Sequence, residues 1–113
     1  MRPEDRIRIE HMLDASQSVA RFIAGRTRED LDSDEMLRFA LVRAIEIIGE
    51  AAGKVSQEGR QGLPEIPWRE AVGIRNRLVH AYFDIDLDVL WKTASTAIPS
   101  LMRQLEAILS HGG

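Results

Sequence analysis

Apolar residues recur at helical spacing along most of this chain, and the first such stretch lies near its amino end. Between Pro3 and Ala24 the residues on one side of a helix are apolar or small, in steps of four and three: Ile9, Leu13, Ser16, Ala20 and Ile23. Pro3 suits the first position of a helix, and Gly25 suits the residue just past its end. The pattern predicts a helix over residues 3–24.

A second helix is predicted to begin at Asp32 or Ser33 and to continue to about Val55. Asp32 followed by Glu35 fits a capping box, in which the first residue caps the helix and the second reaches back to it. The apolar residues of this stretch share one face: Leu37, Leu41, Ala44, Ile48, Ala51 and Val55. This face is predicted to pack in the core.

The opposite side of the second helix is not simply polar. It brings together an aromatic residue, a branched apolar residue, an acid and two glycines: Phe39, Val42, Glu46, Gly49 and Gly53. Each glycine inside a helix costs about 1 kcal/mol relative to alanine, which is tolerable where another body must approach closely. We interpret this side as a second packed face and expect a homodimer.

The remaining sequence predicts two further helices. A loop rich in glycine and proline covers residues 56–67. A third helix is predicted over 68–81 or 68–83, and a fourth follows Asp86, which can cap it. The fourth helix has a long apolar stripe: Leu90, Ala94, Ala97, Ile98, Leu101, Leu105 and Ile108. Pro99 lies inside it and is predicted to bend it or split it in two.

These elements predict an all-α fold, an antiparallel up-and-down bundle of four to five helices, in a single domain over residues 1–113. The composition, 44% hydrophobic and 29% charged, is that of a globular protein. No apolar run is long enough to cross a membrane, and the first residues lack the apolar stretch of a signal peptide. The chain has no cysteine, so we expect no disulfides and a cytoplasmic location.

The net charge of −3 argues against broad electrostatic binding of nucleic acid, which needs many contacts from Lys and Arg to phosphates. Any such binding must come from a local patch. The densest basic stretch contains Arg69, Arg75, Arg77 and His80. The three histidines are far apart in sequence, so we expect no metal site and no cofactor.

The most informative segment is Arg75-Asn76-Arg77-Leu78-Val79-His80-Ala81-Tyr82. It places a permanent cation, an amide, an imidazole and a phenol in an otherwise apolar stretch. A guanidinium can grip a phosphate through two parallel hydrogen bonds, and an imidazole can exchange a proton near neutral pH. This mixture indicates a phosphate-handling site.

On a helical wheel Arg75 lies near the middle of the apolar stripe of the third helix. An unpaired buried guanidinium costs several kcal/mol, so Arg75 needs a carboxylate from Glu46 or Glu50, or a wet cleft. Arg75 and His80 differ by about 140°. Either the Arg side chain curls round, or the helix ends near His80, or a second copy supplies the other residue.

The spacing Arg75-x4-His80-x-Tyr82 resembles the Arg-x4-His-x-Tyr motif of the HepT toxins in the HEPN superfamily. The Asn after Arg75 also fits the common HEPN form. Other segments that look like those of the family are Ile45-Glu46-Ile47-Ile48-Gly49-Glu50-Ala51, Pro67-Trp68 and Ile85-Asp86-Leu87-Asp88-Val89-Leu90-Trp91.

The resemblance implies a homodimeric helical bundle whose two motifs line a shared cleft. It implies a metal-independent endoribonuclease, the toxin of a type VII toxin–antitoxin pair, that acts on RNA. The partner would be an MNT-type nucleotidyltransferase antitoxin, which would neutralise the toxin by transferring AMP onto the motif tyrosine, Tyr82.

In this hypothesis Arg75, His80 and Asn76 are the catalytic residues, and Glu46 and Arg77 support them. One alternative is a non-catalytic HEPN module that binds a nucleotide or a nucleotidyltransferase. Another is a purely structural dimer, which a buried pair of Arg75 and Glu46 with His80 facing bulk water would favour.

Overall fold

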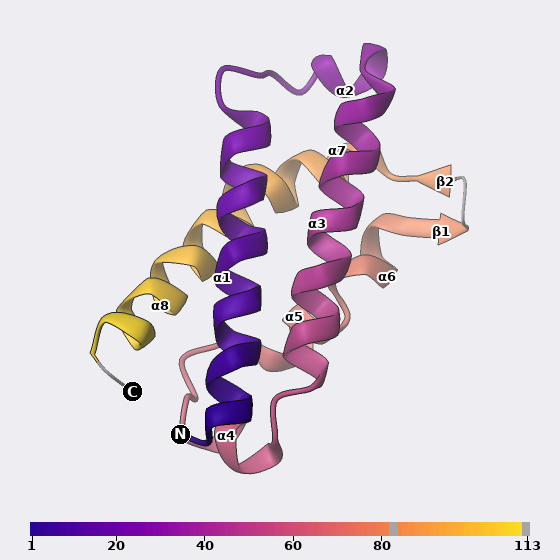
Figure 1. Cartoon of the computed structure of the whole chain (residues 1–113). Coiled ribbons are helices and arrows are strands. Elements are labelled where there is room, and N and C mark those ends of the chain that lie inside the picture. Colours follow the sequence, from indigo (N-terminus) through magenta and orange to yellow (C-terminus); the bar gives the residue numbers. More distant parts are fainter. Residues whose placement is uncertain (82–83, 112–113) are drawn as a thin grey trace.

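Two long helices, α1 (Pro3–Ile23) and α3 (Glu35–Gly53), run side by side in opposite directions and form the frame of the protein (Figure 1). The computed structural model describes residues 1–81 and 84–111. A third long helix, α8 (Ile98–Ser110), packs against α1. None of the helices in the described part of the chain is long and apolar enough to span a membrane.

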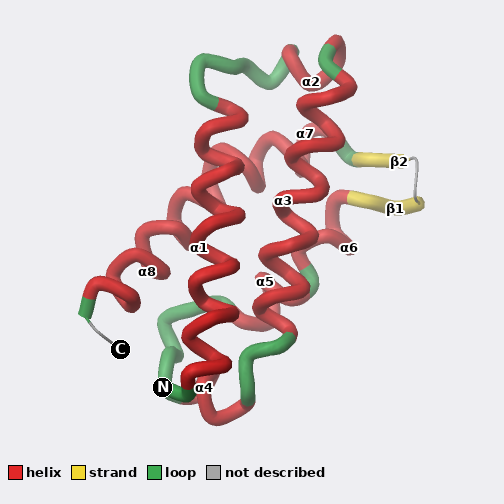
Figure 2. The backbone as a smooth tube through the Cα atoms, viewed as in Figure 1, coloured by secondary structure: helices red, strands yellow, loops and turns green. Residues whose placement is uncertain are grey.

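The shorter elements connect and cover this frame (Figure 2). Between the long helices lie α2 (Asp30–Ser33), α4 (Gln57–Gln61), α5 (Trp68–Val72), α6 (Ile74–Leu78) and α7 (Leu87–Lys92). Two short strands, β1 (Val79–Ala81) and β2 (Asp84–Ile85), pair antiparallel and reach out beyond the helices (Figure 1). The fold is helical as predicted, and this hairpin was not predicted.

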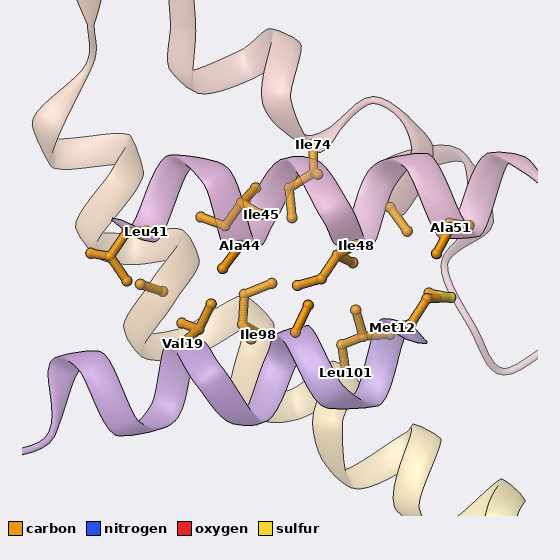
Figure 3. Packing of buried hydrophobic residues seen from close by; sticks show 14 of the residues in the cluster. Met12, Val19, Leu41, Ala44, Ile45, Ile48, Ala51, Ile74, Ile98 and Leu101 are labelled. Carbon is orange, nitrogen blue, oxygen red and sulfur yellow. The ribbon is translucent and has the colours of Figure 1, made fainter. Parts of the chain in front are cut away.

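The core forms where the apolar faces of α1, α3 and α8 meet (Figure 3). Both helical stripes predicted for α1 and α3 contribute to it, and Ser16 is buried there with its hydroxyl donating to the carbonyl of Met12. Fully buried side chains include Ile9, Met12, Val19, Leu41, Ile45, Ile48, Ile98 and Leu105. Burying a side chain of this size stabilises the fold by about 1.5–3 kcal/mol.

The predicted start of the second helix was wrong. Residues 30–33 form the separate short helix α2, and the backbone becomes extended at Asp34. The carboxylate of Asp34 accepts a hydrogen bond from the amide of Leu37 at 3.0 Å, so Asp34 caps α3 in place of Asp32. This hydrogen bond and a second one, from the Arg26 side chain, hold the pKa of Asp34 below its ordinary value.

Other predicted helix boundaries are confirmed. The α1 helix begins at Pro3, and Gly25 adopts a φ of +72° just past its end, a conformation that favours glycine. Asp86 caps α7 by accepting from the amide of Val89 at 3.1 Å. The predicted irregularity of the last helix is present: a wider π-helical turn (Thr93–Ala97) separates α7 from α8, and Pro99 lies in the first turn of α8.

The amino end of α1 is tied to the chain after α3 by a buried carboxylate. Asp5, only 3% exposed, accepts from the amide of Ser56 at 2.9 Å and from its hydroxyl at 2.6 Å. These two hydrogen bonds favour the charged carboxylate more than burial disfavours it, and they hold the pKa of Asp5 below its ordinary value.

We expect the stability contributed by Asp5 to depend on pH. Because its pKa in the folded state lies below its unfolded value of about 3.8, this contribution is present above that value and is lost as pH falls through the folded pKa. Urea unfolding of the parent and Asp5→Asn should therefore give free energies that differ most at neutral pH and converge below about pH 4. Asp14→Asn, an exposed acid on the same helix, is the matched control. A constant difference between parent and Asp5→Asn across this range would contradict the assignment.

Two glycines give opposite expectations for replacement by alanine. A Cβ on Gly59 would lie 2.5 Å from the carboxylate of Asp5, whereas a Cβ on Gly53 would meet nothing within 4 Å. Since Asp5 is buried and fixed by two hydrogen bonds, Gly59→Ala should destabilise the protein by about 1–3 kcal/mol. Gly53→Ala should stabilise it by up to about 1 kcal/mol. Thermal and urea unfolding measure both, and a neutral Gly59→Ala would show that this corner repacks.

Candidate active site

The predicted third helix is wrong in its extent. It is interrupted at Gly73 into α5 and α6, and α6 ends at Leu78, where the backbone becomes extended at Val79. The carbonyl of Leu78 accepts a hydrogen bond at 2.8 Å from the amide of Asp86, which lies just past the hairpin. The helix therefore ends near His80, which was one of the three options open from the sequence.

His80 lies on β1, at an irregularity in the hairpin. Val79 pairs with Ile85 and Ala81 with Asp84, so His80 is the extra residue of a β-bulge. Bulges change the direction in which a side chain points and occur often beside active sites. The His80 side chain is 58% exposed, and its Nε2 lies 4.0 Å from a carboxylate oxygen of Asp86.

Arg75, on α6, is held by a carboxylate, one of the two options that the helical wheel left open. Its Nε donates to Glu46 Oε2 on α3 at 2.6 Å. The pair is not buried in the core, because the Arg75 side chain is 43% exposed. No other described residue forms a hydrogen bond with the guanidinium, so its two Nη groups remain able to donate to a ligand.

Arg75 and Asn76 line an open hollow of about 250 Å³ between α3 and the α5–α6 turn. Its other lining residues are Glu46, Gly49, Glu50 and Val72. A Cβ on Gly49 would lie 3.2 Å from the carbonyl oxygen of Ala71. The close approach that this glycine allows is therefore made by the same chain, which corrects its assignment to another subunit.

Arg43 is a site residue that the sequence reasoning missed. Its Nη1 lies 3.6 Å from a carboxylate oxygen of Glu46 and 3.6 Å from one of Glu50. Positions three and seven residues apart share one side of a helix, and this spacing could have revealed Arg43. Arg43 and Arg75 thus offset both acids of the hollow.

Arg77 and His80 lie apart from this hollow. Arg77 donates to the carbonyl of Glu70 at 3.3 Å and lines a separate hollow with Arg69, Glu70 and Gly73. His80 is not among the residues that line the Arg75 hollow. Within the described part of one chain, Arg75, Asn76 and Glu46 are therefore together, and His80 and Arg77 are not with them.

Two further expectations concern Tyr82 and metals. Tyr82 lies outside the described residues. Across 1–81 and 84–111, no three side chains of His, Asp or Glu gather closely enough to hold a metal ion.

Exposed apolar side chains occur at the start of α3 and at the hollow itself. Met36 is 82% exposed and Phe39 59%, and Val72 on α5 is also exposed. Phe39 was predicted to lie on a second packed face. An aromatic ring left this exposed on a helix that is otherwise well packed is typical of an interaction surface.

Comparison with known proteins identifies the family. The profile of the ribonuclease HepT-like family matches residues 12–108. A protein of Thermococcus cleftensis named "Probable ribonuclease HepT" is 40% identical over 100 residues, which are 88% of this chain and 91% of the relative. A protein of Methanocaldococcus jannaschii named "Putative RNase MJ1380" is 35% identical over 97 residues, 86% of this chain and 89% of the relative. No solved structure matches significantly. The chain therefore belongs to the ribonuclease HepT-like family.

Proposed function

We propose that this chain is a metal-independent endoribonuclease in which Arg75, Asn76 and His80 act on the RNA backbone. Its family and the names of its relatives support a ribonuclease. The observation that carries the proposal is the state of Arg75. Glu46 fixes the guanidinium through Nε, and the two Nη groups stay free at the edge of an open hollow.

The ion pair of Arg75 and Glu46 contributes little to the stability of the fold, but it prepares Arg75 to bind a phosphate. A partly exposed ion pair contributes only about 0–1 kcal/mol to stability. A guanidinium held on one edge presents its other donors in a fixed direction, which is the geometry that binds two phosphate oxygens at once. Holding it in advance also removes the entropy cost of ordering it when RNA binds.

The chemistry needs no cofactor because RNA carries its own nucleophile. The 2′-oxygen attacks the adjacent phosphorus and loses its proton, while the 5′-oxygen leaves and gains one, so that the product is a 2′,3′-cyclic phosphate. His80 transfers a proton, a role worth typically 10²–10⁴-fold. Arg75 stabilises the charge that develops on the phosphate, and Asn76 orients the substrate beside it.

The active unit in this proposal is a homodimer. His80 does not line the Arg75 hollow of its own chain, so in this proposal the second copy brings its His80 to that hollow. For the contact, exposed Val72 supplies apolar surface at that hollow, and exposed Phe39 and Met36 supply more on α3, two to three helical turns before Glu46. Glu46 positions Arg75, and Arg77, on its separate hollow, supports binding of the strand at the rim.

In the cell we propose that the nuclease is the toxin of a type VII toxin–antitoxin pair, with an MNT-type nucleotidyltransferase as its antitoxin. Transfer of AMP from ATP to the hydroxyl of Tyr82, with release of pyrophosphate, would add a bulky anion within the motif. Its phosphate would compete with RNA for Arg75 by the same charge interaction.

A second candidate is a non-catalytic module that binds a nucleotide or the nucleotidyltransferase. The separation of His80 from the Arg75 hollow within one chain favours it. Such a protein would bind ATP or the partner and leave RNA intact at high protein concentration.

Loss of His80 or Arg75 should stop cleavage without unfolding the protein. We expect His80→Ala and Arg75→Ala each to reduce the rate of RNA cleavage by at least about 100-fold. Because Arg75 is partly exposed, the free energy of unfolding of Arg75→Ala should fall by less than about 1 kcal/mol. Cleavage assays and urea unfolding on the same preparations give both values.

The matched controls are His111→Ala and Arg103→Ala, which remove the same side chains from exposed positions on or beyond α8. Cleavage at the parent rate by His80→Ala would refute the nuclease assignment. A large loss of stability in Arg75→Ala would instead support the purely structural dimer.

Modification of Tyr82 can be tested by coexpression. With an MNT-type nucleotidyltransferase, we expect the intact mass to rise by AMP units and RNA cleavage to be lost, since the added phosphate occupies the Arg75 hollow. Tyr82→Phe, which lacks only the hydroxyl, should stay unmodified and active. Loss of activity without a change in mass would point to inhibition by binding alone.

A further inference from the structure

A second basic cluster lies on the solvent side of α3, next to α1. Arg8 and His11 on α1 and Lys54 just past the end of α3 gather around an open hollow of about 90 Å³. The other lining residues are Ile47, Glu50 and Ala51. Three basic side chains therefore face one acid, in a chain whose net charge is −3.

The charge of this cluster is not used within the fold. Among residues 1–81 and 84–111, no carboxylate forms an ion pair with Arg8, His11 or Lys54. The one acid of the lining, Glu50, has Arg43 at 3.6 Å. The acids that share this stripe of α1, Glu4 and Asp14, lie one turn beyond the cluster at either end and do not line the hollow.

The cluster adjoins the candidate active site. Glu50 lines both this hollow and the one that contains Arg75. The two hollows are therefore neighbours along α3, with Glu50 between them. A nucleic-acid strand carries a phosphate about every 3.4 Å along its axis, so one strand can reach both hollows with phosphates a few nucleotides apart.

We propose that Arg8, His11 and Lys54 form a second phosphate-binding subsite, which holds a flanking phosphate of the RNA strand whose scissile phosphate lies at Arg75. This inference rests on the proposed function. The cluster would contact phosphates through its positive charges and would not contact the bases. It would therefore position the strand without selecting its sequence. It also explains how an acidic chain binds RNA, because the affinity comes from a local track across α3.

The subsite is tested by binding to single-stranded RNA in a His80→Ala background, so that binding is measured on intact strands. We expect the double variant Arg8→Ala/Lys54→Ala to raise Kd about 10-fold at low salt. The slope of log Kd against log salt should become shallower by about 1.4, because each phosphate contact on a single strand contributes about 0.7. In the cleavage-competent chain the loss should fall on KM more than on kcat, since the scissile phosphate remains at Arg75.

The matched control is Arg21→Ala/Arg103→Ala, which removes the same charge from exposed positions at the far end of α1 and on α8. Equal Kd values and salt slopes for the two double variants would overturn the subsite. A parent chain that binds RNA through Arg8 and Lys54 but never cleaves it would refute the nuclease and support the subsite. Failure of the His80→Ala parent to bind RNA would overturn the subsite directly.

Discussion

The packing of α1 against α3 is the interaction on which the rest of the structure depends. Their apolar faces meet along most of their length, and Ile9, Met12, Ile45 and Ile48 are fully buried between them and their neighbours. Because an α-helix is rigid and its faces are fixed by the 3.6-residue repeat, burying one side of α3 determines which residues it shows to solvent. Arg43, Glu46 and Glu50 are displayed for this reason, and they form the floor beside which the motif residues lie.

The backbone conformation of the motif depends on the hydrogen bond that the carbonyl of Leu78 accepts. Leu78 could have continued α6, but its oxygen accepts from the amide of Asp86. That hydrogen bond accompanies the end of the helix and the start of the hairpin, where His80 occupies the bulge and does not line the Arg75 hollow. The same residue, Asp86, caps α7 and lies 4.0 Å from the imidazole. Asp86 thereby contacts both the start of α7 and His80, the residue proposed to transfer the proton.

The net charge of the chain does not describe how its charged side chains are distributed over the surface. Arg75 and Arg43 offset Glu46 and Glu50, while the basic cluster on the α1 side has no acidic partner among the described residues. Interactions between exposed charges fade over roughly 10 Å in physiological salt. A strand lying across α3 would therefore respond to these nearby groups and little to the acids elsewhere on the surface.

The sequence alone determined the elements whose evidence is local. The stripe and ends of α1, the apolar face of α3, the cap at Asp86 and the break before Pro99 all follow from spacing and from the properties of proline, glycine and aspartate. It also required either a carboxylate from Glu46 or Glu50 or a wet cleft for Arg75, because a guanidinium within an apolar stripe is too costly to leave unpaired. Only the tertiary structure decided where the third helix ends, which chain covers Gly49, and which side chains share a hollow. These depend on contacts between residues far apart in the sequence, and a helical wheel, which describes each segment by itself, contains no information about such contacts.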